Sequence, residues 1–335
     1  MDGPMSDPSR DASADDRPGA AVEYRPFSVP VRGGRLAGGV WNESAPGLPV
    51  LAVHGITASH LEWPLLASRL ADHPVIAPDL RGRGRSNTLP EPWGMRDHAD
   101  DMAAVLDAFG ADRALVVGHS MGGFVAVRTA DQHPDRVAGL VLVDGGLPLP
   151  IRLPAGVAPA DAATVLLGPA GERLTRVYPS REAYAEFWRG HPAFTEWNEG
   201  IAAYVAYDLD EVDGGFRPAT RLAAVATNIV QQDGGDGYRE ALQRLRVPVD
   251  FLRVPRGLLD ETPGLYHDAV LDPGRALVPG MLVHEITDEN HYSVVMTDHG
   301  IDQVSPIVDL ALERVATTDP RRTGPTEPAE GEESA

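Results

Sequence analysis

Short apolar runs that fit buried strands alternate with helical patterns along most of this 335-residue chain. The strand-like runs are almost continuously apolar, which is typical of a parallel sheet covered on both faces. Strands are expected at residues 50–53, 75–77, 114–117, 137–143, 249–254 and 281–286, and helices at 61–70, 97–109, 121–132 and 301–315. This order predicts an α/β fold with a mostly parallel sheet.

The alternation stops between residues 147 and 240. This stretch opens with several prolines, and nine of the chain's 20 aromatic residues lie between residues 178 and 216. We expect residues 147–240 to form a helical cap, inserted between core segments 21–146 and 241–315. Such a cap would cover the edge of the sheet where ligands bind. The tails, 1–20 and 316–335, have almost no large apolar residues and are predicted to be disordered.

The amino-acid composition excludes several kinds of catalytic group and binding partner. The chain has no cysteine, and all 29 of its basic residues are arginine. Thiolate nucleophiles, Cys-ligated metals and lysine Schiff bases are therefore excluded. A net charge of -20 argues against nucleic acid and anionic membranes as partners. With no signal-like segment and no long apolar run, we expect a cytoplasmic protein that acts on a small molecule.

One motif points to a nucleophile. Gly118-His119-Ser120-Met121-Gly122 matches the G-x-S-x-G pattern and falls between a predicted strand and a predicted helix. A turn this tight requires small residues where the backbones approach, and it exposes the serine hydroxyl at a helix N-terminus. Ser120 is the predicted nucleophile, with the His119 side chain directed away from it.

A serine hydroxyl needs a base, and the base needs an acid to orient it. Among the 11 histidines, His291 follows a predicted strand and is the favoured base. Asp260 follows the strand before it and is the favoured acid. Asp144, at the end of the strand at 137–143, and Glu261, beside Asp260, are the alternatives.

Tetrahedral intermediates of acyl transfer need two N–H groups directed at the oxyanion. We expect one from Met121, the residue after the nucleophile. The other is expected from Ile56, in the loop His54-Gly55-Ile56-Thr57 after the strand at 50–53.

Together these motifs resemble the α/β-hydrolase fold superfamily over residues 22–315, in particular its capped esterase and C–C hydrolase-like branches. The order Ser120, acid, His291 is the order of the family. His54-Gly55 is similar to its H-G oxyanion motif, and residues 78–86 are similar to its D-x-R-G-x-G-x-S turn. The resemblance implies an eight-stranded, mostly parallel sheet flanked by helices, with an inserted cap. Epoxide hydrolases and dehalogenases of this fold carry Asp where this chain has Ser120, which disfavours those activities.

The expected function is therefore a serine hydrolase that cleaves a small, fairly apolar ester, lactone or thioester through an acyl-enzyme on Ser120. No metal or organic cofactor is expected, because the nucleophile and base are side chains of the protein. The alternatives are a C–C bond hydrolase of the same fold and a non-catalytic ligand-binding protein. The sequence leaves the substrate and the oligomeric state open.

Overall fold

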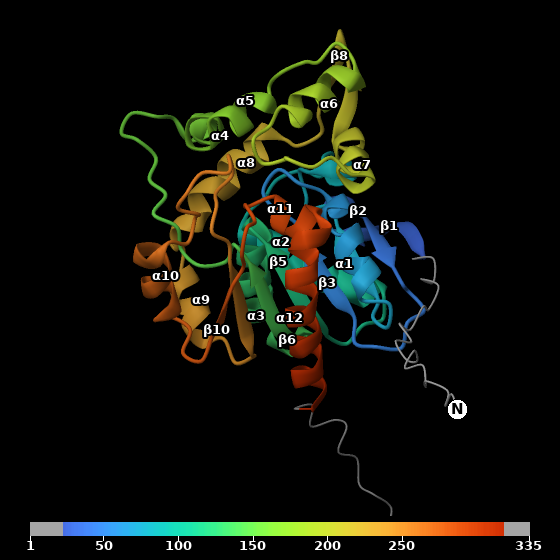
Figure 1. Cartoon of the computed structure of the whole chain (residues 1–335), viewed down its shortest axis with the longest axis vertical. Coiled ribbons are helices and arrows are strands. Elements are labelled where there is room, and N and C mark those ends of the chain that lie inside the picture. The colour runs from blue at the N-terminus through green and yellow to red at the C-terminus, as the bar shows by residue number, and fades with distance from the viewer. Residues whose placement is uncertain (1–22, 318–335) are drawn as a thin grey trace, which may run out of the picture.

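The computed structural model describes residues 23–317. The tail expected at 1–20 lies outside these residues, as does all but the start of the tail expected at 316–335. An eight-stranded sheet carries helices on both faces, and a further group of helices lies above one of its edges (Figure 1). In chain order the strands are β1 (Tyr24–Val31), β2 (Gly34–Trp41), β3 (Val50–Val53), β4 (Val75–Pro78), β5 (Ala114–His119), β6 (Val137–Val143), β9 (Val249–Arg253) and β10 (Leu282–Glu285).

The spatial order of the sheet is β1-β2-β4-β3-β5-β6-β9-β10. From β4 to β10 the neighbouring strands are parallel, whereas β1 and β2 form an antiparallel hairpin that joins the sheet at β4. The prediction of a mostly parallel α/β sheet is confirmed. The apolar patterns do not predict the two strands of this hairpin, because β2 contains glycines and β1 is mostly exposed.

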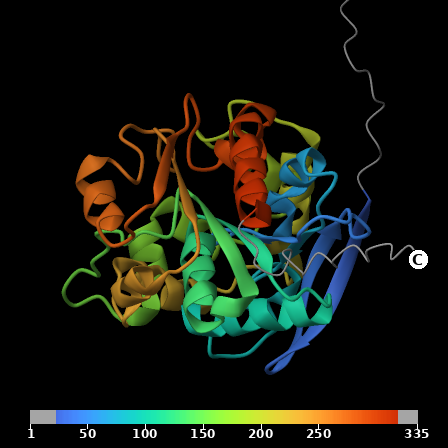
Figure 2. The ribbon, with the colours of Figure 1, turned by 90° about the horizontal axis from the view of Figure 1, so that it is seen from below.

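Two layers of helices cover the sheet (Figure 2). On one face lie α1 (Pro64–Arg69) and α12 (Asp298–Thr317), and on the other α2 (Met95–Ala108), α3 (Met121–Gln132) and α9 (Tyr238–Arg244). Shorter elements complete the core: α10 (Asp268–Arg275), α11 (Ser293–Met296), and the 3-10 turns η1 (His60–Glu62), η2 (Gly84–Ser86) and η3 (Pro134–Arg136).

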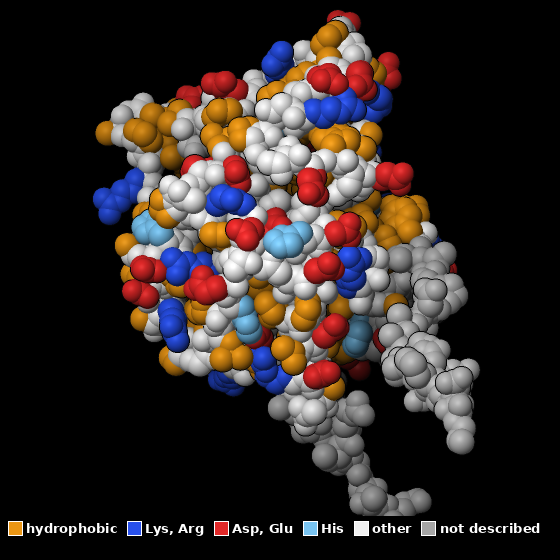
Figure 3. Space-filling view, viewed as in Figure 1, with side chains coloured by type: hydrophobic (Ala, Val, Ile, Leu, Met, Phe, Trp, Pro, Cys, Tyr) orange, Lys and Arg blue, Asp and Glu red, His pale blue; other side chains and the backbone are white. Residues whose placement is uncertain are grey.

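The last helix is longer than its apolar pattern predicts, running over residues 298–317 rather than 301–315. Arg69 of α1 pairs with two carboxylates near the start of this helix, Asp298 (2.8 Å) and Asp302 (2.9 Å). Figure 3 shows acidic and basic side chains intermixed over this face. The surface charge is therefore distributed through ion pairs here, although the chain as a whole is acidic.

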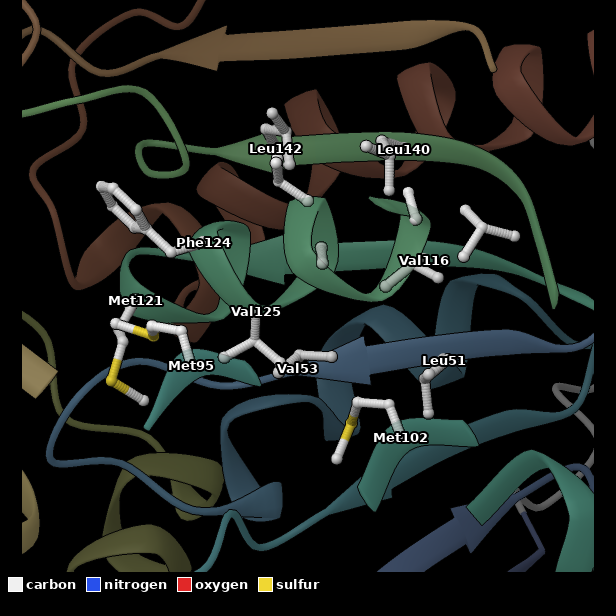
Figure 4. Packing of buried hydrophobic residues seen from close by; sticks show 14 of the residues in the cluster. Leu51, Val53, Met95, Met102, Val116, Met121, Phe124, Val125, Leu140 and Leu142 are labelled. Atoms are coloured by element: carbon white, nitrogen blue, oxygen red, sulfur yellow. The ribbon is translucent and has the colours of Figure 1, made fainter. Parts of the chain in front are cut away.

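Alternating residues of β3 pack into two separate apolar cores, one on each face of the sheet. Leu51 and Val53 belong to the core that also contains Met102 of α2 and Val125 of α3, and Figure 4 shows Val125 beside Val53. Val50 and Ala52 face the opposite core, which includes α12. Burial on both faces explains why the strand sequences are apolar at every position.

The stretch predicted as a helical cap lies above the strand ends (Figure 1). Its elements are η4 (Pro159–Asp161), α4 (Ala162–Leu167), α5 (Pro169–Arg173), α6 (Arg181–Arg189), α7 (Glu199–Tyr207), β7 (Leu209–Val212), β8 (Gly215–Pro218), α8 (Leu222–Ile229) and η5 (Val230–Asp233). The antiparallel hairpin β7–β8 shows that this stretch is not purely helical.

Polar contacts fix the cap to the core. Tyr207 donates to the buried carboxylate of Asp79 (2.6 Å), and Arg85 pairs with Asp210 (2.9 Å). Inside the cap, Arg173 and Asp208 form a fully buried ion pair (2.7 Å). These contacts define how the cap sits over the strand ends.

Candidate active site

Ser120 lies between β5 and α3 with φ 53° and ψ -123°, a backbone conformation that is strained for a residue with a side chain. The turn is possible because its neighbours have no Cβ. A Cβ at Gly122 would clash with the Val53 carbonyl oxygen, and one at Gly145 would clash with the Ser120 carbonyl oxygen. The predicted tight strand-to-helix turn is therefore present.

His291 brings its imidazole to this turn. Its Nε2 lies 3.0 Å from Ser120 Oγ, and its Nδ1 lies 2.7 Å from Asp144 Oδ2. The side chains of His291 and Asp144 are 5% and 0% exposed. With Nδ1–H donating to the carboxylate, Nε2 is free to accept the serine proton. Hydrogen bonds therefore link the predicted nucleophile Ser120 and the predicted base His291 to the carboxylate of Asp144.

The expectation that Asp260 contacts His291 is wrong in this structure. Asp260 Oδ1 instead pairs with Arg256 Nε (3.0 Å) and accepts from Asn290 Nδ2 (3.1 Å), and its side chain is one-third exposed. Asp144, the alternative, follows β6, which pairs directly with β5, so its carboxylate enters beside the nucleophile. Glu261 is exposed and accepts from the Leu259 amide (2.7 Å).

The loop predicted to bind the oxyanion lies next to Ser120. A Cβ built on Gly55 would be 3.4 Å from Ser120 Cβ, and Ile56 lines the same cavity as Ser120. Arg83 Nε donates to the Ile56 carbonyl (2.9 Å), which fixes this peptide. Arg83 is fully buried without a carboxylate contact among the described residues, and this burial lowers the pKa of its guanidinium to about 9. Met121 is the first residue of α3, where amides have no intrahelical partner.

His54 supports the loop from beneath. Its Nδ1 contacts the Gly55 carbonyl (2.8 Å), and its Nε2 accepts from the Leu80 amide (2.9 Å). Burial lowers the pKa of this imidazole, since the charged form loses hydration. His54 therefore acts as a neutral link between the loop and the turn after β4.

The structure contradicts the prediction that the His119 side chain is directed away from Ser120. His119 does not point away from the site: its ring centroid lies 4.7 Å from that of His291, and its Nδ1 lies 3.0 Å from Glu62 Oε1. Glu62 was not a candidate in the sequence, because no motif marks it. Only the path of the chain through η1 brings its carboxylate to the strand end.

Above Ser120 a cavity of about 290 Å³ separates the core from the cap. Its lining is largely apolar and includes Leu149, Ile151, Leu166, Leu167, Ile229, Leu258, Leu265, Tyr266 and Val270. The nine cap aromatics predicted from the sequence do not line it. Several of them, including Tyr184, Trp188 and Tyr204, pack instead in the core that contains Val50 and Ala52.

Residues 23–317 show neither a membrane-spanning helix nor a metal-binding cluster. None of the helices in this range is long and apolar enough to span a membrane. These residues also contain no cluster of three or more His, Asp or Glu side chains that could hold a metal ion.

Comparison with known proteins relates this structure to a known fold. Residues 49–178 match the model of the alpha/beta hydrolase fold. The thioesterase domain from the curacin biosynthetic pathway superposes over 88% of this chain and all of that domain, with a TM-score of 0.66 and 23% identity, which shows a shared fold. The chain therefore has the α/β-hydrolase fold, and residues 49–178 carry the sequence pattern of that fold.

Two relatives in sequence show how far the similarity extends. This α/β-hydrolase-fold protein is 28% identical to 2-(acetamidomethylene)succinate hydrolase of Mesorhizobium japonicum over 80% of its own length and 87% of that protein. It is 44% identical to Lipase LipV of Mycobacterium tuberculosis, but over 30% of its own length and only 38% of the lipase. The chain thus spans little more than a third of the lipase, and the two relatives carry different activities in their names.

Proposed function

We propose that this protein is a serine hydrolase that cleaves a small, uncharged, fairly apolar ester, lactone or thioester through an acyl-enzyme. The observation that carries the proposal is the hydrogen-bonded series Ser120–His291–Asp144 at the base of an apolar cavity. Hydroxyl, imidazole and carboxylate in this order are the requirements for activating a serine at neutral pH.

In the proposed reaction Ser120 Oγ attacks the substrate carbonyl carbon while its proton passes to His291 Nε2. Asp144 accepts the Nδ1–H bond and stabilises the imidazolium. The amides of Ile56 and Met121 bind the oxyanion. As the intermediate collapses, His291 returns the proton to the leaving oxygen or sulfur, and the acyl group stays on Ser120. A water that loses its proton to His291 then releases the acid and restores the serine.

The cavity supports an uncharged substrate. Its residues include no arginine, and its two acidic groups, Glu62 and Asp144, are already bonded to histidines. An anionic substrate would lose hydration there without gaining an arginine partner. An uncharged substrate differs from the one in the name of the Mesorhizobium relative, since a succinate derivative carries carboxylates. A volume of about 290 Å³ is at the lower end for ligand pockets and favours a small acyl group.

The test is a panel of p-nitrophenyl esters from acetate to decanoate, with the hemisuccinate as the anionic member. The proposal expects turnover of short to medium neutral esters, slower turnover of the hemisuccinate, and loss of turnover in Ser120→Ala. Hydrolysis of a vinylogous diketone but none of the esters would favour C–C bond cleavage instead. Turnover of a neutral ester that is unchanged in Ser120→Ala would exclude the serine mechanism.

A further inference from the structure

A second carboxylate–imidazole pair lies beside the proposed triad. Glu62, at the end of η1, and His119, the last residue of β5, meet through Oε1 and Nδ1 at 3.0 Å, with both side chains 2% exposed. Both residues line the cavity that contains Ser120. The catalytic scheme above uses neither of them, although a buried charged pair is costly to place there.

The outer atoms of this pair contact two functional loops. Glu62 Oε2 accepts from the Gly55 amide (3.2 Å), in the loop that carries Ile56. His119 Nε2 lies 2.8 Å from the main-chain oxygen of His291. A continuous series of three hydrogen bonds therefore joins the expected oxyanion loop to the base.

Hydrogen-bond direction restricts what the pair can do. The His291 carbonyl oxygen only accepts, so His119 Nε2 carries a proton and donates it. Burial opposes charge on the imidazole, but the charge and hydrogen bond of Glu62 outweigh it and raise the pKa of His119. Because both ring nitrogens are engaged, His119 cannot take the serine proton in place of His291.

We propose that Glu62 and His119 are positioning residues that hold the Gly55–Ile56 peptide and the His291 backbone at the spacing required for acyl transfer. This inference rests on the proposed function. It predicts an effect on the chemical step rather than on substrate affinity, since neither residue has a free polar group for the substrate. Misplacement of a reacting group by about 1 Å can cost roughly 100-fold in rate.

The experiment compares kcat and KM for a neutral p-nitrophenyl ester in Glu62→Ala, Glu62→Gln, His119→Ala and the double alanine variant. Each alanine variant should lose about 10- to 100-fold in kcat with little change in KM. Glu62→Gln should retain most of the activity, because its amide can accept from Gly55 and donate to His119 Nδ1. The double variant should be little worse than either single one, as expected for members of one series of contacts.

His284→Gln is the matched control. His284 also meets a buried carboxylate, Asp250 (2.8 Å), but on β10 and away from the cavity, so its loss should leave kcat unchanged. Where an alanine variant folds poorly, His119→Asn, which is too short to reach both partners, should show the same loss of kcat. Thermal unfolding establishes which variants are folded at the assay temperature.

Unchanged kcat in folded Glu62→Ala and His119→Asn would overturn the positioning role. Equal impairment of Glu62→Gln and Glu62→Ala would also overturn it, since the charge rather than the geometry would then matter. These outcomes differ from failure of the proposed function, in which the wild type itself would not hydrolyse the esters.

Discussion

The backbone position of Asp144, directly after β6, brings its carboxylate to His291. The residue has φ 43°, in the left-handed region, and its carboxylate is completely buried against His291. Asp260 lies in a longer loop and is held by Arg256 and Asn290. The carboxylate favoured from the sequence is therefore not the one that contacts His291.

Replacing the acid tests this assignment. Asp144→Asn should lower kcat by about 10⁴-fold, because the amide no longer holds the productive tautomer of His291. Asp260→Asn, the matched control, should lower kcat less than about tenfold, since it touches the base loop only through Asn290. Steady-state kinetics on one neutral ester measures both. The reverse ranking would return the acid to Asp260.

Asp79 offers a test by pH. Burial alone would raise the pKa of its carboxyl, but the charge and hydrogen bonds of His60 hold it at about 2, against an ordinary 3.8. Because the pKa is lowered on folding, the group supplies stability of about 2 kcal/mol above pH 4, and this stability is lost as the pH falls toward 2. A carboxyl ¹³C NMR titration, assigned with Asp79→Asn, should give a midpoint near pH 2. A midpoint at 3.8 or higher would contradict it.

How much of the site can be predicted from sequence depends on how local each signal is. Ser120 is marked by residues within two positions of it, and His291 by its place after a strand. The choice among Asp144, Asp260 and Glu261 depends on the path of separate loops, which the sequence does not specify. Glu62 carries no motif, and its proximity to His119 arises only from tertiary packing.

At the scale of elements, the turn from β5 to α3 depends on close backbone contact. The helix begins so near to β3 that the Val53 carbonyl occupies the place of a Cβ at Gly122. This contact sets where the N-terminus of α3, and with it the Met121 amide, meets the loop after β3.

Gly122→Ala should therefore destabilise the fold by about 1–3 kcal/mol or more and lower kcat, because α3 must move away from β3. Gly190→Ala is the control. Gly190 lies at the end of α6 with φ -85°, and the nearest atoms to an added Cβ are 3.6 Å away, so stability should be unchanged. Urea unfolding compares the two variants. Equal stabilities would show that the close approach is not required.

Helices and strands with a strong hydrophobic pattern agree with the sequence prediction, whereas those with a weak pattern are not predicted. The buried parallel strands and helices α2 and α3 were found to within a few residues, since both faces of the strands are apolar. The hairpin β7–β8 was missed because its strands are short and partly exposed, with sequence LDEV in β7. The sequence shows that aromatic residues are concentrated in the cap, but their packing away from the cavity is visible only in the structure.

At the scale of the whole molecule, net charge acts on the approach of the substrate. The chain carries a formal charge of -20, and ion pairs such as Arg69 with Asp298 leave the acidic excess in place. Anionic substrates should therefore be repelled before they reach the cavity.

This repulsion should be visible as a salt effect. For matched p-nitrophenyl esters, the ratio of kcat/KM for the butyrate to that for the hemisuccinate should fall about threefold or more between 0.02 and 0.3 M NaCl, because salt screens the repulsion. The part of the preference that comes from the cavity should remain at high salt. A ratio independent of salt would show that the net charge does not influence selection.

Covalent labelling of Ser120 tests the central claim most directly. Trypsin cleaves after Arg113 and Arg128, and the peptide between them contains Ser120 as its only hydroxyl residue. After reaction of the folded protein with a fluorophosphonate, mass spectrometry should find the adduct on this peptide. Labelling should be strongly reduced in Asp144→Asn, and absent in Ser120→Ala and in urea-unfolded protein. An unlabelled peptide from the folded wild type, or equal labelling after unfolding, would contradict an activated serine at this position.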